Sequence, residues 1–305
     1  MKIATSTGDF KFYCPTDVER IRELHWAGFR YIDFDMYSFK PDCVYMQVGW
    51  REEVLKLKAV ADELGMTFVQ AHSQGGNPLD DDEDRVKFLT DATLRSIEIC
   101  SMLGIENTVV HAGNAPYIGK EEWFDRNKQF YQKLLPVAVD LGVNILTENS
   151  TASNMGGRYY IINGRDMREF IDYVDHPCFH GCWDTGHANC EGSQYDEIMA
   201  LGDALYAIHY NDNHGTRDEH LVPYLGTMNH DEVINALIDV GYKGYFTLEC
   251  SNELIKYNGW PHKRNRFRDD QRKLSQPQLF MQQHMEALMY DTAKWMLETY
   301  GIFED

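Results

Sequence analysis

One unit of sequence recurs along the chain and limits the folds that are open to it. In each copy a polar helical stretch ends at Gly, a short apolar run follows, and the run ends in a polar side chain. A Gly after a helix provides the left-handed backbone that ends it, and runs rich in Val, Ile, Phe, Tyr and Thr are typical of strands. The copies read GFRYIDFD, LGMTFVQAHS, LGIENTVVHAG, LGVNILTENS and GYKGYFTLEC.

Eight strands are predicted in all, and helical stretches separate them. The first helix begins at Thr16, which forms a capping-box pattern with Glu19. Strand and helix in alternation predict a parallel sheet, and eight such units predict an α/β fold of the (β/α)8 TIM barrel type. The alternative, an open doubly wound sheet, would need a Gly-rich phosphate loop, and neither GxGxxG nor GxxxxGK[ST] occurs. The predicted strands lie near residues 2–6, 30–36, 67–72, 107–112, 144–149, 179–184, 204–210 and 244–250.

We expect residues 1–305 to form a single barrel domain, since one barrel commonly needs about 250 residues. Residues 251–277 are predicted to be a loop excursion, and residues 278–303 a C-terminal helix. The excursion is strongly basic. We interpret it as a solvated excursion or a subunit contact, with a lid that recruits a phosphorylated substrate as the alternative. Its basic residues are Lys256, Lys263, Arg264, Arg266, Arg268, Arg272 and Lys273.

Composition restricts the partners and the compartment. The chain has no run of 18 apolar residues and no apolar N-terminal stretch of signal-peptide length, so we expect a cytoplasmic protein with no membrane partner. The net charge of -19 argues against a nucleic-acid partner. The seven cysteines form no CxxC pair, which favours small buried apolar side chains over a zinc–thiolate site.

Ionisable side chains end six of the eight predicted strands, and more follow in the loops. In a barrel, the C-terminal ends of the strands share one mouth, so these side chains should lie together. Burying so many ionisable groups is costly unless a cation compensates, and one divalent ion (Mn, Co, Mg or Zn) is the simplest compensation. The strand ends carry His72, His111, Glu148, Asp184, His209 and Glu249, and the loops add His187, Arg217, Asp218 and His220.

Four motifs in this order resemble those of the xylose isomerase-like barrels: TENS, CWDTGHAN, IHYNDN…RDEHL and TLEC. That superfamily includes ketose 3-epimerases, hydroxypyruvate- and inosose-handling enzymes, sugar-phosphate epimerases and endonuclease IV-type enzymes. The resemblance to the ketose 3-epimerase type implies one metal ion, bound by Glu148, Asp184, His209 and Glu249. It also implies that the two Glu residues act as acid and base. The predicted substrate-binding residues are His72, His111, His187, Arg217, Asp218 and His220.

The resulting expectation is a metal-dependent sugar or sugar-phosphate isomerase or epimerase. It would remove a proton next to a carbonyl and pass through an enediolate. Homologous barrels often form dimers or tetramers, so we also expect a homo-oligomer, with the C-terminal helix as a candidate contact.

Three alternatives stay open. An endonuclease IV-type phosphodiesterase binds three zinc ions through nine ligands. The second alternative is an isomerase or dehydratase of the inosose or hydroxypyruvate type, which would use the same barrel. The third is a binding protein that kept the barrel but lost catalysis. The net charge opposes the nuclease, as does LVPYLGT after His220, where the nuclease type carries a Gly-Glu-Gly-like stretch. Tyr224 and Leu225 also replace the Gly and Glu common in the epimerases. The counterparts of the nine ligands are His72, His111, Glu148, Asp184, His187, His209, Asp218, His220 and Glu249.

Overall fold

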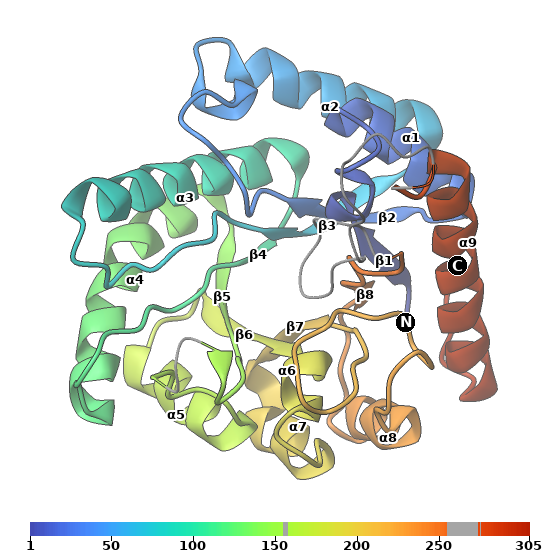
Figure 1. Cartoon of the computed structure of the whole chain (residues 1–305). Helices are drawn as coiled ribbons and strands as arrows, with labels where there is room; N and C mark the ends of the chain where they lie inside the picture. Colours follow the sequence, from blue (N-terminus) through green and yellow to red (C-terminus); the bar gives the residue numbers. More distant parts are fainter. Residues whose placement is uncertain (155–157, 255–273, 275) are drawn as a thin grey trace.

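A parallel sheet of eight strands forms the centre of the molecule, in the order β7-β6-β5-β4-β3-β2-β1-β8 (Figure 1). The computed structural model describes residues 1–154, 158–254, 274 and 276–305. Tyr210 and Leu248 form a parallel bridge that brings β7 beside β8 and closes the sheet into a barrel. The predicted TIM-barrel fold is confirmed. The strands are β1 Ile3–Ser6, β2 Tyr31–Asp35, β3 Thr67–His72, β4 Asn107–Val109, β5 Asn144–Glu148, β6 Phe179–Asp184, β7 Leu205–His209 and β8 Phe246–Leu248.

Helices surround the barrel, and local sequence fixes many of their ends (Figure 1). The predicted capping box is present at the start of α1, where Thr16 accepts from the Glu19 backbone and the Glu19 side chain accepts from Thr16. Gly104 ends α3 with φ 76°, a left-handed conformation in which a β-carbon would be strained. The helices are α1 Asp17–Ala27, α2 Trp50–Leu64, α3 Glu83–Leu103, α4 Lys120–Leu141, α5 Gly164–Val174, α6 Thr185–Asn189, α7 Tyr195–Leu201, α8 His230–Asp239 and α9 Leu279–Thr299.

The barrel interior has an apolar layer below a polar one. Val109, Leu146, Cys182 and Ala207 form a small buried cluster on four neighbouring strands. Side chains two residues apart share one face of a strand. Glu148, Asp184 and His209, each two positions after a member of this cluster, therefore also point inward. The large apolar core lies between the strands and the helices. Glu148, Asp184 and His209 lie at the C-terminal ends of β5, β6 and β7.

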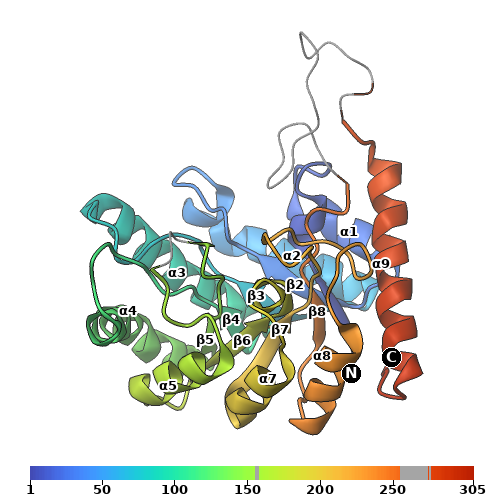
Figure 2. The ribbon, with the colours of Figure 1, turned by 60° about the horizontal axis from the view of Figure 1, so that its bottom comes forward.

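The long helix α9 packs beside α1 and the first strand (Figure 2). Thr5 connects the barrel to this helix, because its Oγ1 lies 2.7 Å from Asp9 Oδ2 and 3.4 Å from Glu286 Oε1. Burial raises the pKa of both carboxyl groups well above their usual range. Past α9, the chain returns to its own start, where the Met1 ammonium contacts the Ile302 carbonyl and lies 3.1 Å from Glu304 Oε1.

Other sequence-based expectations concern the membrane, the cysteines and the basic excursion. In the part of the chain that the structure describes, no helix is long and apolar enough to cross a membrane. All seven cysteines are free thiols, and four of them are buried: Cys14, Cys100, Cys182 and Cys250. The basic residues predicted to form a lid or a contact lie outside the described residues.

Candidate functional site

The four predicted metal ligands meet at the mouth of the barrel. One ligand atom from each of Glu148, Asp184, His209 and Glu249 lies within 4.8 Å of the ligand atoms of the other three. Glu148, Asp184 and His209 are buried, and Glu249, which directly follows β8, is partly buried. Three carboxylates this close repel one another unless a cation lies between them. The donor set of three carboxylates and one imidazole therefore fits a divalent ion such as Mn²⁺, Co²⁺, Mg²⁺ or Zn²⁺.

His209 is oriented for this role by a residue on the far side of its ring. Its Nδ1 faces the other ligands, 2.7 Å from Glu148 Oε1 and 3.4 Å from Glu249 Oε2. Its Nε2 lies 3.4 Å from Oδ2 of Asp33, which also accepts from Gln70 Nε2 at 3.2 Å. A carboxylate behind a histidine ligand fixes the orientation of the ring and increases its basicity. Nδ1 is therefore the nitrogen that would bind the ion.

Asp33 and Gln70 were missed by sequence reasoning, which considered strand ends alone. Both are polar and buried, on β2 and β3. A signal was present: Asp33 lies between apolar residues in YIDFD and Gln70 in FVQAH. A polar residue flanked by apolar ones within a strand of a closed barrel points into the interior.

Asp184 is held by backbone and amide groups. It caps α6, a short helix that the sequence analysis did not predict, by accepting from the His187 backbone N–H at 2.6 Å. Asn211 Nδ2 donates to its other oxygen at 2.8 Å. Asn149 Oδ1 accepts from the Asp184 backbone N–H at 2.7 Å. The carboxylate therefore has a fixed orientation before any ion arrives.

His111 contacts Glu148 directly, and His72 Nε2 lies 3.7 Å from Glu148 Oε2. His111 Nε2 lies 2.5 Å from Glu148 Oε2, and His72 Nε2 lies 3.1 Å from His111 Nε2. Burial alone would raise the pKa of Glu148, but the surrounding histidines outweigh it and hold that pKa well below its usual range. At Glu249, by contrast, burial raises the pKa despite the neighbouring His209, His220 and His72. The two glutamates therefore occupy different electrostatic environments.

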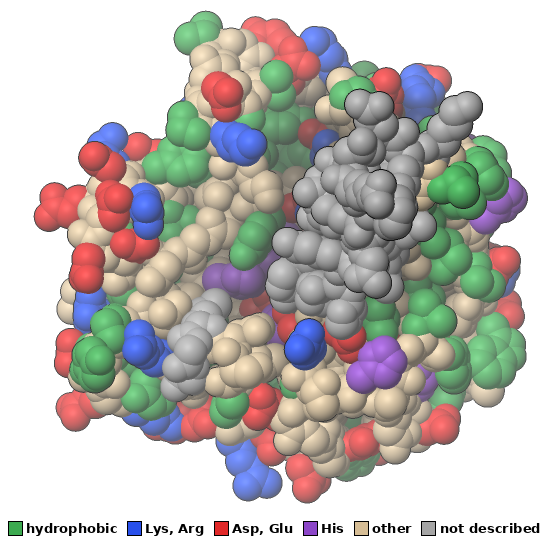
Figure 3. Space-filling model, viewed as in Figure 1, with side chains coloured by type: hydrophobic (Ala, Val, Ile, Leu, Met, Phe, Trp, Pro, Cys, Tyr) green, Lys and Arg blue, Asp and Glu red, His purple; other side chains and the backbone are tan. Residues whose placement is uncertain are grey.

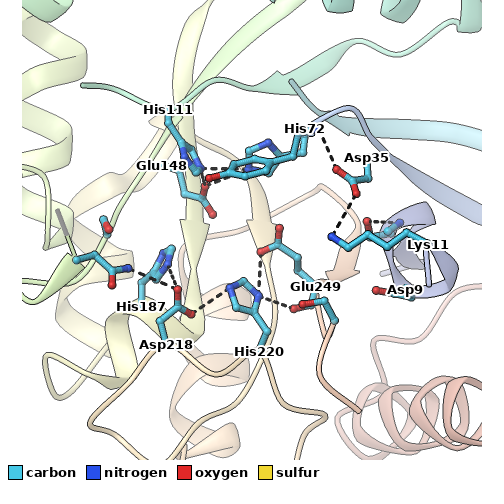
Figure 4. Close-up of a pocket in the computed structure, with 16 residues that line it drawn as sticks. Asp9, Lys11, Asp35, His72, His111, Glu148, His187, Asp218, His220 and Glu249 are labelled. Atoms are coloured by element: carbon cyan, nitrogen blue, oxygen red, sulfur yellow. Dashed lines mark hydrogen bonds and ion pairs between the residues drawn. The ribbon is translucent and has the colours of Figure 1, made fainter. Parts of the chain in front are cut away.

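A second group of side chains lies across the pocket from His72 and His111 (Figure 4). His187 Nε2 lies 3.1 Å from Asp218 Oδ2, and His220 Nε2 lies 3.0 Å from Asp218 Oδ1. Burial alone would lower the pKa of His187, but Asp184 and Asp218 raise it to about 10. His220 also contacts Glu249, since its Nδ1 lies 2.9 Å from the Glu249 carbonyl oxygen. These residues can offer several donors and acceptors to the hydroxyls of a ligand.

A cavity of about 460 Å³ joins the two groups and opens at the mouth, where Figure 3 shows histidine side chains near the centre of the face. His72, His111, His187, Asp218 and His220 all line it, as their predicted substrate-binding role requires. Arg217 is exposed and is absent from the described lining. The ends of β1 and β2 and the segment after β1 contribute lining residues that sequence reasoning missed: Ser6, Gly8, Asp9, Lys11 and Asp35.

The sequence and the barrel together place the chain in a family. A family model described as "Xylose isomerase-like TIM barrel" matches residues 21–276. The chain therefore belongs to the xylose isomerase-like TIM barrel family, and the resemblance inferred from the four motifs is confirmed.

Several known proteins are similar to this chain. An uncharacterized protein of Methanocaldococcus jannaschii is 31% identical over 55% of this chain, and the match spans 59% of that relative's own length. Fructoselysine 3-epimerase of Shigella flexneri is 24% identical over 74% of this chain and 81% of its own. The solved structure of D-psicose 3-epimerase with D-tagatose, from Clostridium cellulolyticum H10, is 19% identical with a TM-score of 0.75. That match covers 97% of this chain and 99% of the other.

Proposed function

We propose that this protein is an isomerase that epimerises a ketose sugar with the help of one divalent metal ion. The observation that carries the proposal is the convergence of four ligand atoms within 4.8 Å at the mouth of a barrel of this family. The similarity to fructoselysine 3-epimerase and to D-psicose 3-epimerase supports carbon 3 of a ketose as the reacting centre.

In this proposal, a divalent ion held by Glu148, Asp184, His209 and Glu249 would supply the positive charge that makes the proton next to the substrate carbonyl more acidic. Glu148 and Glu249 move the proton. One carboxylate takes the proton from carbon, and the electron pair of the broken C–H bond becomes part of the enediolate. The other returns a proton to the same carbon from the opposite face, which inverts its configuration. Both side chains line the cavity, so both can reach a bound substrate.

The other lining residues position the substrate and Glu148. His111, 2.5 Å from Glu148 Oε2, fixes the rotamer of that glutamate. His187, Asp218 and His220 contact one another and would hold substrate hydroxyls next to the reacting carbon. Because a base must be within hydrogen-bond reach of the proton it takes, this positioning matters as much as the acidity of the groups.

A phosphodiesterase with several metal ions is the second candidate, and one observation favours it. Apart from the four-ligand group, two groups of donors near the mouth each have their ligand atoms within 4.8 Å of one another. One is His72, Glu148 and His209, and the other is His187, Asp218 and His220. The charge of the pocket argues against it. Among the described lining residues Lys11 is the one lysine or arginine, whereas five are Asp or Glu. A phosphodiester backbone would be bound more favourably by a basic groove.

Replacing Glu148 by Gln tests the proposed function. We expect the exchange of solvent deuterium into carbon 3 of a ketohexose to fall by at least about 10²-fold, since Gln cannot accept the proton. Glu169→Gln, on the exposed side of α5, is the matched control and should exchange like the wild type. Exchange by Glu148→Gln at a rate close to that of the wild type would refute the role of this residue.

A further inference from the structure

The pocket has one end that the proposed chemistry does not use. Figure 4 shows the reacting glutamates near the middle, the group around His187 on one side, and Lys11 with Asp35 on another. A substrate whose carbon 3 lies between Glu148 and Glu249 has further carbons to place, and this end of the cavity is available to them.

Lys11 and Asp35 are close without forming a hydrogen bond. Lys11 Nζ lies 3.9 Å from Asp35 Oδ2, which is too long for a direct N–H···O bond. The Asp35 side chain is otherwise fixed, because its Oδ1 accepts from the Tyr37 backbone N–H at 2.9 Å. The Asp35 backbone N–H donates to Thr7 Oγ1, also at 2.9 Å. The carboxylate therefore presents Oδ2 to the cavity in one orientation.

Gly8 keeps the space beside this oxygen free. A β-carbon at position 8 would lie 2.7 Å from Asp35 Oδ2 and 3.1 Å from Ser6 Oγ. Any other residue would therefore push against the two oxygens. Ser6 Oγ accepts from the Gly8 backbone N–H at 3.0 Å, so its own proton can be donated to a ligand.

We propose that Lys11, Asp35 and Ser6 form a subsite for the hydroxyl-bearing tail of an uncharged ketose, and that this subsite selects a free sugar over one with a phosphorylated tail. One hydroxyl fits the gap between Lys11 and Asp35, because it can accept from Nζ and donate to Oδ2. A neighbouring hydroxyl accepts from Ser6 Oγ. The inference rests on the proposed function and adds the class of its substrate.

Charge explains the selection against a phosphate. Among the described lining residues at this end of the pocket, the positive charge of Lys11 is balanced by Asp35, so these residues offer an anion no net attraction. Asp9, Glu148, Asp218 and Glu249 also line the cavity, and the lining histidines His187 and His220 lie against Asp218. A phosphate would have to give up its water next to the Asp35 carboxylate, which costs far more than placing a hydroxyl there.

The test compares D-fructose with D-fructose 6-phosphate in the metal-loaded protein. It uses Lys11→Met, which keeps the length of the side chain, and Asp35→Asn, which can still accept from Tyr37. With fructose, each variant should raise KM about tenfold and change kcat much less, the loss expected for one hydrogen bond to a charged group. Calorimetric binding of fructose should weaken by a similar factor. Asp35→Asn should in addition lower KM for the phosphate, because the charge of Lys11 is no longer balanced.

Lys87→Met, on the exposed side of α3, is the matched control and should behave like the wild type with both sugars. Unchanged KM and binding for fructose in both variants would overturn the subsite. A Lys11→Met variant that binds D-fructose 6-phosphate more weakly but still binds D-fructose normally would also overturn the subsite. If the wild type binds metal but exchanges no proton with any ketose, the proposed function fails and the subsite fails with it. Normal exchange together with unaffected variants would overturn the subsite alone.

Discussion

At the scale of single residues, the proposed histidine ligand, His209, has a carboxylate behind its ring. Asp33 Oδ2 lies 3.4 Å from His209 Nε2, and Gln70 donates to the same oxygen. Thr247 Oγ1 in turn donates to Gln70 Oε1 at 3.2 Å, so three strands contribute to this support. The polar layer below the mouth therefore fixes the orientation of the proposed histidine ligand.

Replacing Asp33 by Asn should weaken the binding of the metal ion by about 10- to 100-fold, the effect expected when the partner of a histidine ligand is lost. The fold should persist, because Asn fills the same volume. Titration of the metal-free protein with Mn²⁺, followed by calorimetry, measures the affinity. Unchanged affinity in a folded variant would show that Asp33 does not support His209.

The convergence of the candidate metal ligands was predictable from sequence, whereas much of the lining of the cavity was not. Glu148 and Asp184 end apolar runs, and parallel strands bring such ends together. Lys11 lies just after a short 3-10 helix, Thr7–Phe10, where no sequence pattern specifies the direction of a side chain. Arg217 gives the opposite case, since its loop position indicated a contact and the folded loop leaves it exposed.

At the scale of elements, the segment between β7 and α8 is organised around one carboxylate. Asp212 is buried and accepts from four backbone N–H groups, those of Asn213, Tyr224, Gly226 and Met228, at 2.8–3.1 Å. Tyr224 has φ 74°, in the left-handed region that costs a non-glycine residue free energy. The hydrogen bond from its backbone N–H to Asp212 holds this conformation.

Replacing Asp212 by Asn should destabilise the protein by about 1–3 kcal/mol at pH 7, because an amide NH₂ would face backbone donors. The effect should depend on pH. Burial alone would raise the pKa of Asp212, but His230 and the backbone donors lower it. A lowered pKa contributes stability above the unfolded-state value of about 3.9, and that stability is lost as the pH falls through the folded-state value. The difference from the wild type should therefore shrink below about pH 4.

Urea unfolding at a series of pH values measures this difference. Asp291→Asn, an exposed change on α9 that removes the same charge, is the control and should be close to neutral. A difference that stays constant from pH 7 to pH 3 would rule out the ionised carboxylate as the source of the stability.

The strands and most helices were predictable because local signals define them. Thr16 caps the first helix, and glycines end several others before a strand begins. Helix α6 was not predictable in the same way. It is five residues long, and its cap, Asp184, is fixed by Asn149 and Asn211 from other parts of the chain. Short elements of this kind depend on tertiary contacts and leave little trace in local sequence.

At the scale of the whole molecule, the barrel separates stability from chemistry. The chain ends meet on the face where the strands begin, through Met1 and Glu304, whereas the carboxylates and histidines gather where the strands end. The predicted oligomer contact on the C-terminal helix stays a prediction. That helix does expose large apolar side chains, including Phe280, Leu288 and Trp295, each more than half exposed.

The number of metal ions per chain distinguishes the two candidate functions at this scale. Glu148 belongs to two of the donor groups, so one ion at the four-ligand site would leave the remaining histidines free to hold substrate. Three ions would instead occupy those histidines as ligands, as in the endonuclease IV type.

Elemental analysis of the purified protein after brief dialysis is therefore the measurement to make first. We expect about one divalent ion per chain, bound by Glu148, Asp184, His209 and Glu249, and largely lost in Asp184→Asn. Close to three zinc ions per chain would contradict the single-ion account and favour the phosphodiesterase.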